Sequence, residues 1–238
     1  MLPLSPFRAI MRAGALPMTL LLVGGCALFG RSETTLPDHM DQHWNRLDQV
    51  QSALFIGDLE GARGPARWLA EHTEHPDLPQ GVLSPVEDMR AFGRSVVRST
   101  SVSDAARCAA EMAAACGRCH QAAGSGPWLQ QNTMPEAGRE ARPHMRRHLW
   151  AMNRMWEGMA GASDQAWSRG ATALAEDPLF LEVGDGGTQE VLALARQVHE
   201  LGAVARAQPR NDRAGVYARL VVACAQCHSL MGVTATVR

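Results

Sequence analysis

The sequence contains no lysine, and all 23 of its basic residues are arginine. Against them stand 24 acidic residues, so the 238-residue chain has a formal net charge of −1. Proteins that bind nucleic acid need a basic excess to neutralise phosphates, and that excess is missing here. We therefore expect no nucleic-acid partner. Any cationic docking surface must use guanidinium groups, which favour planar bidentate contacts.

Long apolar runs are also scarce. The stretch from Leu16 to Val23 follows two arginines and is too short to span a bilayer as a helix. This pattern predicts an export signal over residues 1–25. The tetrapeptide that ends at Cys26, Val-Gly-Gly-Cys, resembles a bacterial lipobox, whose cysteine becomes the lipidated first residue of the mature protein. Ordinary cleavage nearby and an uncleaved anchor are the alternatives.

Residues 26–36 form the predicted tether between the lipid and the folded body, because they show no helical periodicity. We expect the protein on the periplasmic side of a bacterial membrane, where a lipid on Cys26 would anchor it. Ordinary signal cleavage would instead leave it soluble in the periplasm.

Cysteine is rare as well, and four of the six cysteines fall in two copies of one pattern. Residues 116–120, Cys-Gly-Arg-Cys-His, and 224–228, Cys-Ala-Gln-Cys-His, both match Cys-x-x-Cys-His, the attachment motif of a c-type haem. Two thiols at this spacing can each add to a vinyl group of the haem, and the adjacent imidazole then binds the iron. The sequence therefore predicts two covalently bound haem c groups. The expected attachment residues are Cys116, Cys119, Cys224 and Cys227, and the expected proximal iron ligands are His120 and His228.

Two other uses of paired cysteines explain the pattern less well. A zinc site made of four thiolates would not need the two histidines, and a redox dithiol normally opens a helix that follows a strand. Of the two remaining cysteines, Cys26 is the candidate lipid anchor. Cys108 is expected to be a small buried residue.

Apolar residues recur at helical spacing, and the pattern occurs twice. The first stripe is Met40, Trp44, Leu47, Val50 and Leu54, and its counterpart 105 residues later is Met145, Leu149, Met152, Met155 and Met159. The haem motifs are offset by 108 residues, so each half reads as four helices that end in a haem motif. No strand signal is convincing. We therefore expect an all-α fold of two tandem four-helix bundles, with haem domains at 37–123 and 143–238 and a linker at 124–142.

Polar residues mark the expected helix starts. Asp58 and Ser163 are the predicted N-caps of the second helix in each half. Residues 84–87, Ser-Pro-Val-Glu, have the form of a capping box with proline at the first helical position. Asp104 is expected to start the fourth helix.

Both halves carry Met-x-x-His near the start of the first helix, as Met40/His43 and Met145/His148. In an up-down-up-down bundle, the start of the first helix lies beside the end of the fourth, where the haem motif stands. Recurrence favours His43 and His148 as the distal iron ligands, and Met40 and Met145 are the alternative. His39 and His144, or an open five-coordinate iron, complete the possibilities.

Four-helix repeats with Cys-x-x-Cys-His near the end of the last helix resemble the cytochrome c prime family and its six-coordinate relatives, here as a tandem dihaem protein. The resemblance covers residues 37–238. It implies haem attachment at both motifs, with the two motif histidines as proximal ligands. In six-coordinate members the distal ligand is a first-helix methionine, which points to Met40 and Met145. The histidine that follows each of these methionines departs from that pattern.

These features predict a membrane-tethered electron carrier rather than an enzyme. Two low-spin haems would relay single electrons between a membrane oxidoreductase and another redox partner in the periplasm or membrane. A five-coordinate protein that binds nitric oxide or carbon monoxide is the alternative. A dihaem peroxidase is less well supported, because both halves share one design and no acid/base constellation stands outside the haem motifs.

Overall fold

The computed structural model describes residues 34–127, 129, 132–136, 141–176 and 188–233, which belong to one compact unit. The predicted export signal, Cys26 and the tether up to residue 33 lie outside these residues. Every regular element in the described part of the chain is helical, which confirms the all-α prediction. The α-helices are α1 (Leu36–Phe55), α2 (Leu59–Glu71), α3 (Leu83–Arg98), α4 (Val102–Ala123), α5 (Ala141–Ala160), α6 (Asp164–Glu176), α7 (Gln189–Arg206) and α8 (Arg213–Leu230). Short 3-10 turns, η1 (Gln80–Val82) and η2 (Arg210–Asp212), precede α3 and α8.

The helices begin at polar caps in most places. Asp58 accepts a hydrogen bond from the backbone N–H of Gly61 at the start of α2, and Ser163 accepts one from Ala166 at the start of α6. Both predicted caps are therefore confirmed. At each helix start the side-chain oxygen satisfies one of the backbone donors that has no partner within the helix.

Two predicted helix starts are wrong. The capping box at residues 84–87 does not form, because η1 runs directly into α3 and the helix begins at Leu83 with no side-chain cap. Burial of Val82 in the core draws the chain into the helix before Ser84 is reached. At α4 the cap is Ser101, whose hydroxyl accepts from the backbone N–H of Asp104, so Asp104 lies in the first turn.

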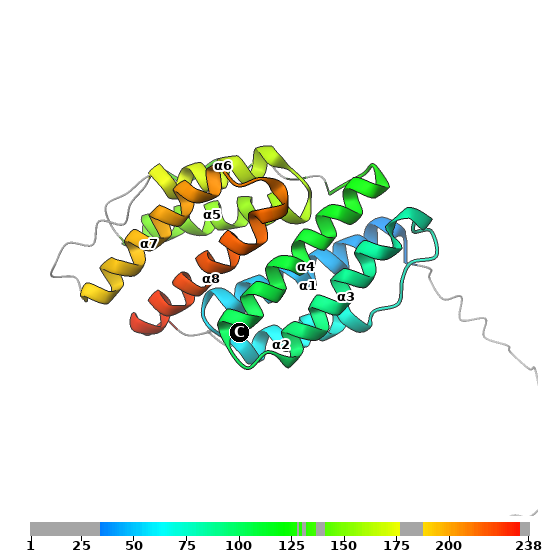
Figure 1. Ribbon diagram of the computed structural model, residues 1–238, viewed down its shortest axis with the longest axis horizontal. Coiled ribbons are helices and arrows are strands. Elements are labelled where there is room, and N and C mark those ends of the chain that lie inside the picture. The colour runs from blue at the N-terminus through cyan, green and yellow to red at the C-terminus, as the bar shows by residue number, and fades with distance from the viewer. Residues whose placement is uncertain (1–33, 128, 130–131, 137–140, 177–187, 234–238) are drawn as a thin grey trace, which may run out of the picture. The chain divides into compact units, whose positions relative to one another are not determined.

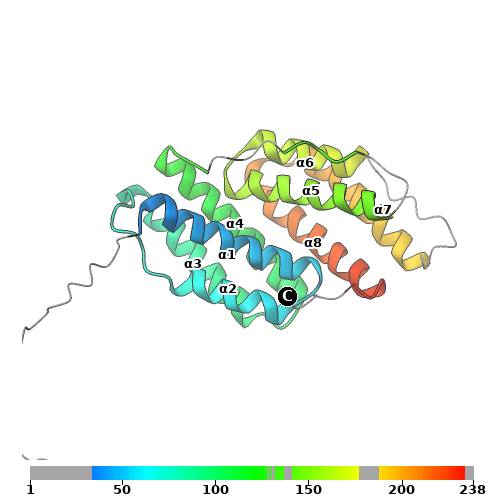
Figure 2. The same cartoon turned by 180° about the vertical axis from the view of Figure 1, so that it is seen from behind.

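In each half, helices that follow one another along the chain pack together, and the last helix packs against the first. In the first half (α1–α4), each helix contacts the next and α4 returns to contact α1. The second half (α5–α8) repeats this order of contacts. Between the halves α4 lies alongside α8, with further contacts from α4 to α5 and from α1 to α8 (Figures 1 and 2). The ends of α4 and α8, which carry the two Cys-x-x-Cys-His motifs, are thereby brought close to the other half.

The 105-residue repeat is visible in the helix boundaries. α5 begins and ends 105 residues after α1, and α6 stands in the same relation to α2. Both first helices are followed by a residue in the left-handed region, Gly57 at φ 74° and Ala162 at φ 55°, again 105 residues apart. Alanine rarely adopts this conformation, so its presence at the equivalent position shows how strongly the turn is specified.

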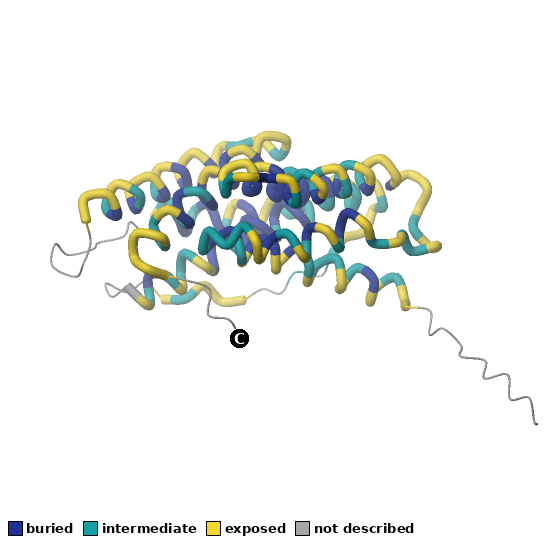
Figure 3. Tube along the Cα trace, turned by 90° about the horizontal axis from the view of Figure 1, so that it is seen from below, coloured by how far each residue is buried: buried dark blue, intermediate teal, exposed yellow. Residues whose placement is uncertain are grey.

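One continuous hydrophobic core contains residues of both halves, and the buried segments coloured dark blue in Figure 3 lie along the inward sides of the helices. Cys108 is buried, as predicted. Between the halves, the amide of Gln51 on α1 donates to the hydroxyl of Tyr217 on α8 at 2.6 Å, and that hydroxyl donates to the carbonyl of Met152 on α5 at 3.2 Å. The ring of Trp156 stacks on Tyr217 with centroids 5.3 Å apart. None of the helices in the described residues is long and apolar enough to cross a membrane.

Candidate functional site

The predicted attachment cysteines lie near the C-terminal ends of α4 and α8. Burial raises the pKa of Cys116 and of Cys224 to about 12, and it also raises the pKa of Cys119 and Cys227. Redox-active and metal-binding cysteines need a lowered pKa, because the thiolate is the reactive form. These four sulfurs are therefore neutral thiols at physiological pH when no metal is bound, and they lack the lowered pKa of a redox-active dithiol.

The two motif histidines make equivalent hydrogen bonds, and each bond reaches into the other half. His120 Nδ1 lies 2.7 Å from the carbonyl oxygen of Ala160 at the end of α5. His228 Nδ1 lies 2.7 Å from the carbonyl oxygen of Phe55 at the end of α1. A carbonyl can only accept, so each Nδ1 carries the hydrogen. Nε2 of each ring is then the nitrogen with an available lone pair.

The accepting carbonyls belong to the last turns of α1 and α5, where carbonyl groups have no partner within the helix. They also stand at the negative end of the helix dipole, which favours a positively polarised imidazole. In His120 the bond to Ala160 works against burial, which is the larger effect and lowers the pKa of the ring. A neutral ring with a fixed tautomer is the form that binds a metal.

A close approach of the two halves accompanies the His120 bond. Gly117, the second residue of the first motif, is buried against the end of α5, and a Cβ added there would overlap the carbonyl oxygen of Met159. Glycine is therefore required at this position by packing. In the second motif the equivalent residue is Ala225. Its Cβ would be in ordinary van der Waals contact with a Cβ added at Gly57.

A cavity of about 820 Å³ brings together the predicted site residues of the first half. Cys116, Cys119 and His120 line it from α4, and Met40 and His43 line it from α1. The second half supplies part of the wall, because Arg154, Glu157 and Ala160 of α5 also line it. Arg154 and Glu157 form an ion pair there, and both side chains are largely buried.

His43 is the better-defined of the two candidate distal ligands in this cavity. Its Nε2 is buried and has no hydrogen-bond partner. Burial, followed by the charges of His39, His72, Arg90 and His120, lowers the pKa of His43 to about 3. The ring is therefore neutral at physiological pH and presents an unused nitrogen lone pair. Met40 is partly buried and lines the same cavity.

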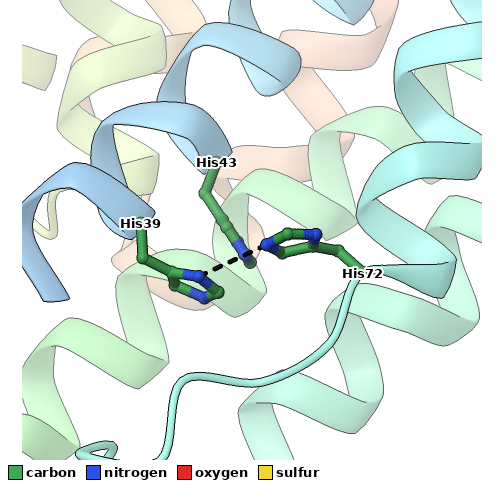
Figure 4. Close-up of side chains that lie close together, drawn as sticks. All are labelled: His39, His43 and His72. Atoms are coloured by element: carbon green, nitrogen blue, oxygen red, sulfur yellow. Dashed lines mark hydrogen bonds between the residues drawn. The ribbon is translucent and has the colours of Figure 1, made fainter. Parts of the chain in front are cut away.

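His39, His43 and His72 form a cluster at the edge of this cavity (Figure 4). One nitrogen of each lies within 4.8 Å of the others, and His72 Nε2 is 3.3 Å from His39 Nδ1. Sequence reasoning considered His39 as a ligand but did not identify His72, which immediately follows α2 and stacks on Trp68 with centroids 3.7 Å apart. The His-x-x-x-His spacing of residues 39 and 43 was the available signal, because it places both rings on one helical face.

The second half is described less completely. His144 and His148 lie close together on α5, with ring centroids 4.3 Å apart, and α5 contacts α8, which carries His228. Met145 is on the same turn of α5 and is partly buried. Residues 177–187, which correspond to the stretch that follows α2, lie outside the described residues. A comparison of the chain with protein-family models, with curated proteins and with solved structures found no match.

Proposed function

We propose that this protein is a dihaem c-type cytochrome that transfers single electrons, built from two tandem four-helix bundles with one covalently attached haem each. The observation that carries the proposal is the cavity of the first half. It gathers the two cysteines and the histidine of one Cys-x-x-Cys-His motif together with the buried, unpartnered Nε2 of His43.

The residues present fit a haem. The cavity volume of about 820 Å³ falls in the range of cofactor and ligand pockets, roughly 300–1,000 Å³. Neutral, partly buried thiols line one side of it, and thioether formation consumes thiols of this kind without leaving a charge behind. The orphaned nitrogen of His43 is a buried polar atom that needs a partner, and an iron ion would satisfy it.

Each residue then has a defined part. Cys116 and Cys119 hold the first haem by thioether bonds, and Cys224 and Cys227 hold the second. His120 and His228 bind the iron through Nε2, while their Nδ1–H groups are fixed on the Ala160 and Phe55 carbonyls. A haem held in this way supplies a one-electron ferric/ferrous couple at its iron. A second protein ligand, His43 or Met40 in the first half and His148 or Met145 in the second, would keep the geometry nearly constant between the two oxidation states.

Export and a lipid on Cys26 would place this carrier at the periplasmic face of a membrane. Its partners would be redox proteins in the periplasm or the membrane. The chain's small net charge supports neither nucleic-acid binding nor a strongly charged docking field.

The test is haem content and spin state of the full chain produced in a host that matures c-type cytochromes. We expect two haems per chain that remain attached on a denaturing gel, and low-spin ferric spectra. Replacing Cys116 and Cys119 with alanine should leave one haem per chain, and replacing all four motif cysteines should leave none. Absence of covalent haem would overturn the proposal. High-spin haems that bind carbon monoxide readily would replace electron transfer with gas binding as the function.

A further inference from the structure

The histidine cluster beside the first cavity has the geometry of a metal site in its own right. His39 and His43 are four residues apart on α1, so their rings share one helical face, and His72 reaches them from the end of α2 (Figure 4). The 3.3 Å between His39 Nδ1 and His72 Nε2 matches the separation of about 3.3 Å between two nitrogens that each lie about 2.0–2.1 Å from a tetrahedral ion. The third nitrogen, from His43, lies within 4.8 Å of both, so it must move closer to them when an ion binds.

The burial of the cluster distinguishes it from a chance grouping of surface histidines. His39 is only 5% exposed, and the Nε2 atom of His43 is buried without a hydrogen-bond partner. An unsatisfied buried nitrogen is costly, so a group that binds it is expected. Stacking on Trp68 holds the ring of His72 in place, and the backbone N–H of His72 bonds back to the carbonyl of the same tryptophan.

We propose that His39, His43 and His72 form a three-histidine site for a divalent transition metal ion, with Zn²⁺ or Cu²⁺ as the ion that fits. Imidazole is the ligand that suits both ions, whereas Mg²⁺ and Ca²⁺ require oxygen ligands. Three histidines leave one coordination position for water or another small ligand, as in catalytic zinc sites.

Among the described residues, the three-histidine cluster occurs in the first half. The repeat supplies His144 and His148 as counterparts of His39 and His43, but 105 residues after His72 the sequence has Asp177. The two halves therefore differ in ligand set at the position where the metal would complete its coordination.

Metal binding has a consequence for the iron that rests on the proposed function. The Nε2 of His43 cannot serve two metal ions at once. Where the ion takes Nε2 of His43, occupancy of the three-histidine site would remove His43 from the first haem iron and leave Met40 or an open position there, while the second haem stays unchanged. The metal site itself does not depend on the haem.

The experiment measures Zn²⁺ binding to the full-length, haem-loaded and metal-depleted protein by calorimetry, with metal content determined after dialysis. We expect one Zn²⁺ per chain for the wild type. His39→Ala and His72→Ala should each weaken binding at least about 100-fold, since even the loss of an outer-shell partner costs 10–100-fold. The matched control is His75→Ala. His75 lies beside the cluster, with its ring centroid 5.5 Å from that of His39, but its Nε2 bonds to the Thr34 carbonyl, so its removal should leave Zn²⁺ affinity unchanged.

A second measurement does not depend on the folding of a variant. The wild type with one equivalent of Cu²⁺ should give an electron paramagnetic resonance spectrum with hyperfine structure from imidazole nitrogens. Absence of stoichiometric binding by both ions would overturn the metal site, and so would binding that persists in His39→Ala and His72→Ala. A change in the Soret band of one of the two haems on Zn²⁺ addition would show that His43 is an iron ligand and that Zn²⁺ displaces it from the iron. Binding of one Zn²⁺ without a Soret change would support the metal site and show that His43 is not a ligand of the first iron.

Discussion

The imidazole of His120 donates a hydrogen bond to the backbone carbonyl of Ala160, a residue at the end of the first helix of the other half. His228 makes the reciprocal bond to Phe55. The orientation of each motif histidine is thus set by a helix that belongs to the opposite half. Such a bond fixes the tautomer of a ligating histidine and increases its basicity. Substitutions at the ends of α1 and α5 should therefore change the orientation and basicity of the motif histidines.

Gly117→Ala tests the close approach that accompanies this bond. An added Cβ would overlap the carbonyl oxygen of Met159, so the end of α5 must move away from α4. We expect a loss of about 1–3 kcal/mol in the free energy of unfolding, the usual cost of overpacking. Chemical denaturation followed by circular dichroism measures this.

The matched control for that variant is Gly215→Ala, at an exposed position in the first turn of α8, where an added Cβ meets nothing within 4 Å. Alanine is a better helix former than glycine, so this change should raise the free energy of unfolding by about 0.5–1 kcal/mol. Equal effects of the two substitutions would show that the contact between α4 and α5 is looser than described.

Tyr217→Phe tests the buried bond between the halves. Removing the hydroxyl takes away the 2.6 Å partner of the Gln51 amide and a donor to the Met152 carbonyl. We expect the free energy of unfolding to fall by about 1–3 kcal/mol, because buried polar groups lose their hydrogen-bond partners. Combining this change with Gln51→Leu should cost less than the sum of the two single changes, by roughly 1 kcal/mol, in a double-mutant cycle. Strict additivity would show that the two side chains do not interact in solution.

Asp164 should contribute to the pH dependence of stability. Its hydrogen bond from Arg210 is the main cause of its lowered pKa, and Arg213 adds to the effect. A carboxyl with a lowered pKa in the folded state stabilises above its ordinary pKa, and this stabilisation is lost as the pH falls through the lowered value. The Asp164 side chain is 65% exposed, so solvent screening limits the effect to about 1 kcal/mol or less.

Asp164→Asn should therefore lower stability at pH 7, and the difference should shrink as the pH falls below the ordinary carboxyl pKa and through the lowered pKa of Asp164, where the wild-type carboxyl becomes protonated. Thermal unfolding of both proteins across this pH range gives the comparison. A constant difference at all pH values would mean that the effect is not caused by the charge.

The sixth iron ligand can be assigned by paired substitutions in the haem-loaded protein. If His43 binds the first iron, His43→Ala should convert half of the ferric haem to high spin, while Met40→Leu leaves the spectrum unchanged. The same comparison between His148→Ala and Met145→Leu addresses the second haem. Opposite results would assign the methionines, and a wild-type spectrum in all four variants would indicate that neither residue type binds the iron.

Local patterns predicted much of the fold. Helical periodicity and the 105-residue repeat identified every α-helix of the first half and the caps at Asp58 and Ser163, because these depend on residues within one or two turns. The capping box at residues 84–87 was predicted wrongly, because burial of the preceding Val82 outweighed a favourable local cap. The expected order of the helices placed the start of the first helix beside the first Cys-x-x-Cys-His motif, and Met40 and His43 do line one cavity with that motif.

Sequence patterns did not predict contacts between residues far apart along the chain, or contacts made by backbone atoms. His72 lies 29 residues beyond His43 and joins it only because α2 runs back along α1. The Phe55 and Ala160 carbonyls carry no side-chain signal at all. Arg154 and Glu157 line the cavity of the first half although they belong to the second, and no sequence pattern indicated this contribution.

The reciprocal bonds are alike in geometry but differ in the length of chain that each must close. His120 and Ala160 are 40 residues apart, whereas Phe55 and His228 are separated by 173. Loop-closure entropy grows with the logarithm of length, so the longer closure costs about 1.3 kcal/mol more. It also requires the last helix of the chain to find the first. The contact that orients His120 can therefore form before α8 is synthesised, whereas the contact that orients His228 is expected to form late in folding.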